Sequence, residues 1–114
     1  MNELSLENVT LAPGVVETVV SLATLSVEGV ASIGAKPTSG LRSIFTHKPA
    51  SHDVKITFNE KGDIEVELHI SVFFGARLIV LVDAISDAVV DAVNGQLGMH
   101  VCDVAVYVDA IVKD

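Results

Sequence analysis

Large aromatic residues and cysteine are scarce in this chain of 114 residues, which contains no tryptophan, one tyrosine, four phenylalanines and a single cysteine. So few aromatic residues leave little material for the stacking platforms that bind nucleic acid bases. Because Cys102 stands alone, no disulfide can form within the chain, and this fits the reducing interior of a cell. We therefore expect a cytoplasmic protein that folds without disulfides.

Positive charge and long apolar runs are also scarce. The 7 lysine and arginine residues are outnumbered by 15 aspartates and glutamates, and the formal net charge is −8. Nucleic acid phosphates and anionic membrane surfaces repel a chain with this balance. Apolar stretches such as residues 78–82 are too short to cross a bilayer, and residues 1–4 show no sign of a signal peptide. We expect neither nucleic acid as the partner nor direct insertion into a membrane.

Aliphatic residues are abundant, since half of the chain is hydrophobic and the mean hydropathy is +0.56. A chain of this length can bury one core without the help of disulfides or metal. We expect residues 1–114 to form a single domain, and the high hydropathy to reflect a buried core together with an interface.

Two segments show helical periodicity. Pro13 suits the first turn of a helix, and we expect that helix to stop at Gly29. A second helix is expected over residues 78–93, stopped by the Asn-Gly pair and followed by a turn at residues 95–98. In the first helix the expected apolar face consists of Val15, Val16, Val19, Leu22, Ala23 and Val27, and the polar face of Glu17, Ser21, Thr24 and Glu28.

Alternation of apolar and polar residues predicts strands at residues 30–34, 53–58, 63–73 and 99–111. Within the last strand, Cys102, Val104, Val106 and Val108 are expected to face inward. A strand, a helix and a strand in succession place the two strands parallel in one sheet. The expected fold class is α+β, a two-layer sandwich in the order helix-strand-strand-strand-helix-strand, with two helices packed on one face of a mixed sheet.

Residues 36–50 break the regular pattern with two prolines and a glycine, and we expect an irregular loop of a kind that is often mobile or functional. The loop combines positive charge with apolar side chains. Its candidate partner-binding residues are Lys36, Leu41, Arg42, Ile44, Phe45 and Lys48. Either they form a contact site, or the apolar members fold back onto the core, as is common under long loops. The sequence leaves both alternatives open.

No catalytic, metal or cofactor site is predicted. Asp83, Asp87 and Asp91 lie four apart on one helix face; a hard cation could bind them, but an amphipathic helix needs such a solvated face in any case. His69 is expected on the wet face of the sheet near Glu67, where it could form a pH-sensitive contact. The other histidines, like His69, lack the spacing of a zinc site; they are His47, His52 and His100.

Two further features each have a structural and a functional interpretation. Cys102 is either a small buried hydrophobic residue or a reactive thiol, and its expected inward position favours the first. Residues 95–98 match the GxxG of KH-type RNA-binding modules, in which the motif joins two helices and clamps RNA. Here the motif is expected to join a helix to a strand, which favours a simple turn.

Three segments in order resemble the alkaline shock protein family, which is found mainly in Gram-positive bacteria. They are VEGVASI at residues 27–33, IEVELHISVFFG at residues 64–75 and LGMHVCDVAVYV at residues 97–108. The second departs from the family pattern at Phe74, where most members have tyrosine. The likeness covers nearly the whole chain apart from residues 36–50.

The resemblance implies a non-enzymatic protein of the cytoplasm, tied to cell-envelope homeostasis and stress. Some family members are held at the membrane by a separate membrane-anchored protein, and some self-assemble. The family offers no catalytic residues to carry over. The resulting hypothesis is an interaction or scaffold protein that associates with itself as a homo-oligomer and binds a protein partner. The alternative is a nucleic-acid-binding module that uses the basic loop at residues 36–50.

Overall fold

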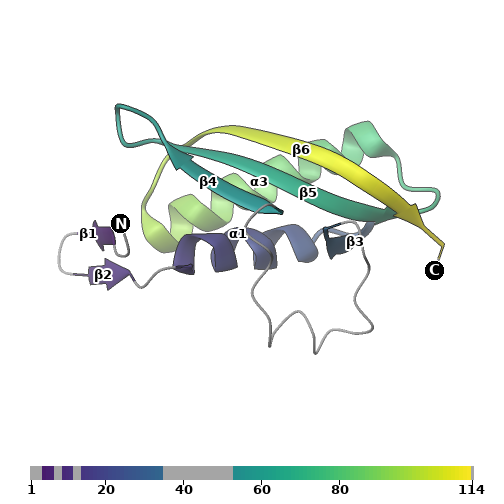
Figure 1. Ribbon diagram of the computed structural model, residues 1–114, viewed down its shortest axis with the longest axis horizontal. Helices are drawn as coiled ribbons and strands as arrows, with labels where there is room; N and C mark the ends of the chain where they lie inside the picture. Colours follow the sequence, from purple (N-terminus) through teal and green to yellow (C-terminus); the bar gives the residue numbers. More distant parts are fainter. Residues whose placement is uncertain (1–3, 7–8, 12–13, 35–52, 114) are drawn as a thin grey trace.

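The ten-residue strand β5 (Ile64–Phe73) forms the centre of the main sheet in the computed structural model, which describes residues 4–6, 9–11, 14–34 and 53–113 (Figure 1). Strand β6 (Val101–Val112) pairs with β5 in parallel along its whole length. Strands β3 (Val30–Ile33) and β4 (Val54–Phe58) pair with β5 antiparallel. The sheet is therefore mixed, and the parallel pairing expected across the strand–helix–strand unit is confirmed.

Strands β3 and β4 follow one another along the same edge of β5. The N–H of His69 donates to the carbonyl oxygen of Asp53 at 2.8 Å, and the carbonyl oxygen of His69 accepts from the N–H of Gly34 at 2.7 Å. The N–H and C=O of one strand residue point to the same edge of an antiparallel pair. Gly34 and Asp53, which border residues 35–52 in the chain, thus both bond to His69.

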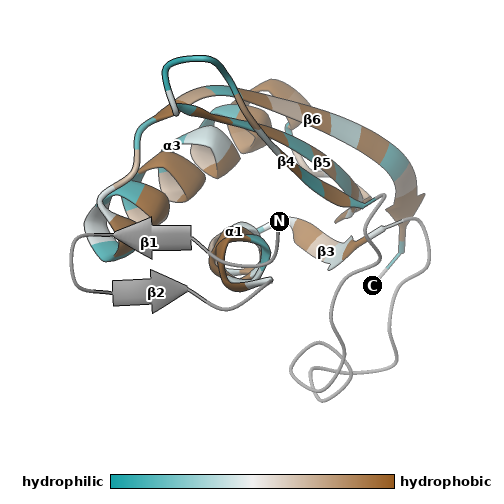
Figure 2. Cartoon of the chain, turned by 60° about the vertical axis from the view of Figure 1, so that its left-hand side comes forward, coloured by the Kyte–Doolittle hydropathy of each residue, from teal (hydrophilic) through white to brown (hydrophobic). Residues whose placement is uncertain are grey.

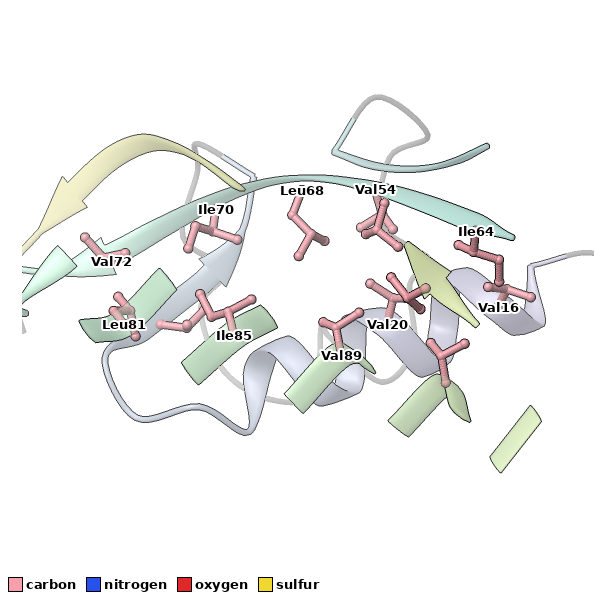
Figure 3. Packing of buried hydrophobic residues seen from close by; sticks show 14 residues of the cluster. Val16, Val20, Val54, Ile64, Leu68, Ile70, Val72, Leu81, Ile85 and Val89 are labelled. Atoms are coloured by element: carbon pink, nitrogen blue, oxygen red, sulfur yellow. The ribbon is translucent and has the colours of Figure 1, made fainter. Parts of the chain in front are cut away.

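Helices α1 (Val15–Leu25) and α3 (Leu78–Leu97) lie beneath one face of the main sheet, as Figures 1 and 2 show. This is the expected α+β arrangement of two helices and a mixed sheet. The core lies between the sheet and the helices (Figure 3). Every second residue of β5 and every fourth residue of α3 is buried in it, as the periods of a strand and a helix require. Its main members are Ile64, Val66, Leu68, Ile70, Val72, Leu81, Ile85, Val89 and Val93.

A second, two-stranded antiparallel sheet precedes α1 and consists of β1 (Leu4–Leu6) and β2 (Val9–Leu11). Each strand spans three residues, which is too short for periodicity to reveal it. The order expected from the sequence therefore holds from α1 onward.

The polar face expected for α1 is partly buried. Ser21 and Thr24 are 4% and 0% exposed, whereas Leu22, expected in the core, is 43% exposed. The hydroxyls of Ser21 and Thr24 donate to the carbonyl oxygens of Glu17 and Val20, one turn earlier, each at 2.8 Å. A hydroxyl that is bonded within its own helix can be buried at little cost. The assignment of these three residues from the sequence is therefore wrong.

Helix α3 continues about one turn beyond its expected end. Residues 94–97 are helical, and the helix ends at Gly98, which has a φ of 68° and donates its N–H to the carbonyl oxygen of Asn94 at 2.9 Å. An Asn-Gly pair resembles a helix end, but the left-handed residue that caps this helix is Gly98. The interpretation of residues 95–98 as a turn is therefore wrong.

A one-residue bulge near the start of β6 changes the position of Cys102. Val101 pairs with Ile64, but the next pair is Asp103 with Glu65, so Cys102 is the extra residue. Val101 is 6% exposed and belongs to the core, whereas Cys102 is exposed. The expected inward position of Cys102 is wrong, because alternation alone cannot reveal a bulge. The other residues expected to face inward do pack against the core; they are Val104, Val106 and Val108.

Candidate interaction site

The contact site predicted from the sequence lies outside the described residues. This applies to all six of its members, Lys36, Leu41, Arg42, Ile44, Phe45 and Lys48, and to His47 and His52. Their role as a partner-binding surface, or as the basic surface of a nucleic-acid-binding module, therefore stays a prediction.

The ends of β5 and β6 and the start of α3 lie at one end of the molecule (Figure 1), and six exposed apolar residues belong to these segments. We call this group the apolar end. Its members and their exposed fractions are Phe73 (36%), Phe74 (79%), Leu78 (40%), Ile79 (82%), Val80 (59%) and Ile111 (57%). Single exposed apolar residues are ordinary, whereas several of them at one end of a molecule point to an interaction site.

The backbone that carries the apolar end is held firmly. The N–H of Phe73 donates to the carbonyl oxygen of Gly29 at 2.9 Å, and that of Phe74 donates to the carbonyl oxygen of Val112 at 2.7 Å. The N–H of Ala76 closes the following turn onto the carbonyl oxygen of Phe73 at 3.1 Å. These bonds fix both phenylalanines at the end of the sheet while their side chains remain in solvent.

The first three residues of α3 are all exposed. Leu81 is the first residue of the helix to enter the core, at 4% exposed. Arg77 precedes the helix with an extended backbone and makes no capping hydrogen bond through its side chain. The first turn contains no acidic residue, although the N-terminus of a helix favours negative charge. This terminus is therefore both apolar and electrostatically positive.

Charge at the apolar end differs from that of the chain as a whole. Residues 73–82 and 110–113 contain two cations, Arg77 and Lys113, and no carboxylate. Farther along α3, Asp83, Asp87 and Asp91 are exposed, which confirms the solvated face expected for that helix. The apolar end is thus a region without acidic residues on a chain whose formal net charge is −8.

A polar cluster lies on the sheet face away from the helices and joins β5 to β6. The ring of His69 sits between two carboxylates, with Nε2 at 3.1 Å from Oε2 of Glu67 and Nδ1 at 2.9 Å from Oδ2 of Asp109. The same ring stacks on Tyr107, with the centroids 4.6 Å apart and the planes inclined by 7°. We call these four residues the His69 cluster.

The two carboxylates favour the charged form of the imidazole. The hydrogen bond to Glu67 has the largest effect on the pKa of His69. The hydrogen bond to Asp109 and the negative charges of both carboxylates act in the same direction. Together they raise the pKa above its ordinary value of 6.5, although desolvation lowers it. Because both ring nitrogens bond to carboxylates of the protein, neither is free to act on a substrate. The cluster links two strands, and protonation of His69 strengthens that link.

The His69 cluster predicts a loss of stability as pH rises. Folding raises this pKa, so the contribution of protonated His69 to stability is complete below 6.5 and disappears as pH passes through the higher pKa of the folded state. We expect urea unfolding from about pH 5 to about pH 8 to show this decline, and His69→Gln to remove it. His100→Gln, which removes an exposed imidazole outside the cluster, is the control. An unchanged decline in His69→Gln would contradict the assignment.

The contact of His69 with Glu67 could be expected from the sequence, but its partners on β6 could not. Asp109 is the extra residue of a second bulge, because Val108 pairs with Ile70 and Ala110 with the next residue, Ser71. Only the parallel register of β5 and β6 brings Tyr107 opposite His69. A single-sequence pattern contains neither piece of information.

Within the described residues, the other candidate sites of the sequence have no set of side chains that could bind a ligand such as a metal ion. In that part of the chain no group of three or more histidine, cysteine, aspartate or glutamate side chains is arranged to hold a metal ion. Cys102 is exposed, and its Sγ accepts a long hydrogen bond of 3.6 Å from Nδ2 of Asn59. Over the same described ranges, neither helix has the length and hydropathy that a membrane span requires.

A family model of the alkaline shock protein type, described as having a cell envelope-related function, matches residues 1–113. The match covers both helices, all described strands and the residues that lie between them. No curated protein and no solved structure matches the chain.

Proposed function

Because the chain belongs to the alkaline shock protein family, whose function is related to the cell envelope, we propose that it is a non-catalytic interaction or scaffold protein of cell-envelope homeostasis. It associates with itself and binds a protein partner. It works in the cytoplasm, comes to the membrane through a membrane-anchored partner, and takes part in the response to stress.

The observation that carries this proposal is the apolar end. Phe74 and Ile79 expose 79% and 82% of their surface, although the backbone around them is fixed by hydrogen bonds. Exposed apolar surface is unfavourable in water, and burying it against another protein contributes roughly 25 cal/mol per Å². Rigid aromatic and aliphatic anchors of this kind make up the centres of protein interfaces.

The chemistry of the His69 cluster supports binding over catalysis. A general base needs a ring nitrogen within reach of a substrate proton, and both nitrogens of His69 bond to carboxylates. A nucleophile needs an adjacent base, whereas Sγ of Cys102 accepts a hydrogen bond from the amide of Asn59. The polar side chains of the His69 cluster therefore stabilise the sheet and are not arranged for catalysis.

Substitution of Phe74 and Ile79, the two most exposed residues of the apolar end, tests the proposal. We expect Phe74→Ser combined with Ile79→Ser to weaken self-association and partner capture by about tenfold or more, since buried anchors dominate binding energy. The matched control combines Phe58→Ser with Leu22→Ser, which removes two apolar side chains that are 40% and 43% exposed elsewhere on the molecule. Sedimentation across a concentration series measures self-association. Capture from the native cell, compared between the two variants, measures the partner.

Two results would count against this function. If the wild-type protein sediments at 12.0 kDa at every concentration and enriches no protein more than the apolar-end variant does, the scaffold proposal is refuted. If both double variants behave like the wild type, the binding surface lies elsewhere and the apolar end loses its role.

A further inference from the structure

We propose that the apolar end pairs with a second copy of this chain across a two-fold axis that passes beside Val80. The first turns of the two α3 helices lie antiparallel, and Arg77 of each copy faces Asp83 of the other. This inference rests on the self-association proposed above and assigns it a surface and a geometry.

The outward face of α3 provides the contact. Asp83 follows Val80 by three residues and Ile79 by four, and side chains at these spacings are neighbours on a helix surface. Ile79 and Val80 are 82% and 59% exposed, and Asp83 is exposed as well. The apolar first turn and the first acidic residue of the helix therefore form one continuous surface, and Phe74 precedes the helix by four residues.

The charges on this surface are complementary to themselves. Arg77 lies three residues before Val80, and Asp83 lies three residues after it. An antiparallel pair centred on Val80 therefore places Arg77 of each copy opposite Asp83 of the other, at both ends of the contact. A two-fold axis requires this kind of self-complementary patch. Neither Arg77 nor Asp83 forms an ion pair with another described residue, so both are available to a second copy.

The free N-terminus of α3 favours the same arrangement. The helix has no side-chain cap and no acidic residue in its first turn. In the antiparallel pair, Asp83 of the second copy lies beside this terminus and supplies the missing negative charge. The two helix dipoles also run in opposite directions, which is their favourable orientation.

Net charge argues that this end, and not another face, accepts a second copy. Two chains that each have a formal net charge of −8 repel one another, so contact is favoured where carboxylates are few. Residues 73–83 contain a single carboxylate, Asp83, together with Arg77. Helices that cross at an angle diverge away from their contact point, which keeps Asp87 and Asp91 outside the overlap. A contact of so few residues on each copy supports a weak, concentration-dependent pair.

Charge reversal tests the pairing directly. Arg77→Asp places two carboxylates opposite each other at both ends of the contact, and Asp83→Arg places two cations there. We expect each single variant to dimerise about tenfold or more weakly than the wild type, because like charges at an interface are strongly unfavourable. Arg77→Asp also supplies a good helix cap, so the variant remains folded and its loss of association reports on the interface. Circular dichroism checks the fold of each variant.

The decisive measurement is whether combining the two charge reversals restores dimerisation. We expect the variant that carries both reversals to dimerise again, and an equimolar mixture of the two single variants to form a heterodimer. Sedimentation equilibrium measures the weight-average mass, which rises toward twice 12.0 kDa for a pair. If the wild type self-associates but the single reversals do not weaken it, or if mixing them restores nothing, this interface is refuted while self-association stands. A wild type that stays monomeric overturns both.

Discussion

Leu68→Ala is expected to lower the free energy of unfolding by about 3–5 kcal/mol, the upper part of the range for a fully buried leucine. Leu68 is 0% exposed, and it lies in the middle of β5 between the sheet and the helices (Figure 3). The cavity left by its side chain cannot collapse easily, because β5 is held by three other strands. A domain has only about 5–15 kcal/mol of stability, so this single change removes a large part of it.

Urea unfolding and thermal melting measure the effect, which corresponds to a fall in Tm of about 10–20 °C. The control is Leu22→Ala, the same chemical change at a leucine that is 43% exposed on α1. We expect it to cost less than about 1 kcal/mol, since alanine is also the better helix former. Equal losses in the two variants would contradict the assignment of Leu68 to the core and of Leu22 to the surface.

The elements of the main sheet and α3 could be predicted because each buries one face. In β5 the side chains at every second position are buried, from Ile64 to Val72. In α3 the buried residues recur every fourth position from Leu81 onward. One-sided burial forces a periodic sequence, and the period identifies both the element and its inner face. The α+β class followed from the order of these elements.

The errors share a different physical origin, since each depends on a contact that periodicity does not contain. The bulges at Cys102 and Asp109 exist only in the register between β6 and β5. Ser21 and Thr24 are buried because their hydroxyls bond within α1, an option that a hydropathy pattern treats as polar. A sequence pattern assigns residues to faces as if strands were continuous and polar groups always sought water.

The exposed residues of the apolar end could be expected from the sequence, because consecutive apolar residues occur there. Residues 78–82 are five apolar residues in a row, and no amphipathic helix can bury five consecutive positions on one side. Phe73 and Phe74 are adjacent at the end of a strand, where neighbouring side chains point to opposite faces. Both facts require exposed apolar side chains. Their meeting at one end of the molecule depends on the turn that joins β5 to α3 and on the crossover that brings the end of β6 beside the end of β5.

Gly34→Ala is expected to destabilise the protein by about 2–4 kcal/mol, because two costs coincide at this residue. Gly34 has a φ of 92°, a conformation that L side chains rarely adopt. A Cβ atom there would lie 2.8 Å from Oδ2 of Asp53, so the carboxylate would have to move. The carbonyl oxygen of Gly34 also accepts the hydroxyl of Ser71 at 2.6 Å, in a buried site that tolerates little shift. The substitution therefore strains the point where β3 and β4 meet on β5.

Gly62→Ala separates the two costs. Gly62 has a similar φ of 83° in the turn between β4 and β5, but a Cβ atom there would meet nothing within 4 Å. It should lose only the conformational part, about 1–2 kcal/mol. Urea unfolding compares the two variants, and amide resonances of His69 and Ser71 should shift in Gly34→Ala alone. If the two substitutions cost the same, the close approach of Gly34 to Asp53 adds nothing, and the junction of β3 and β4 is looser than its hydrogen bonds indicate.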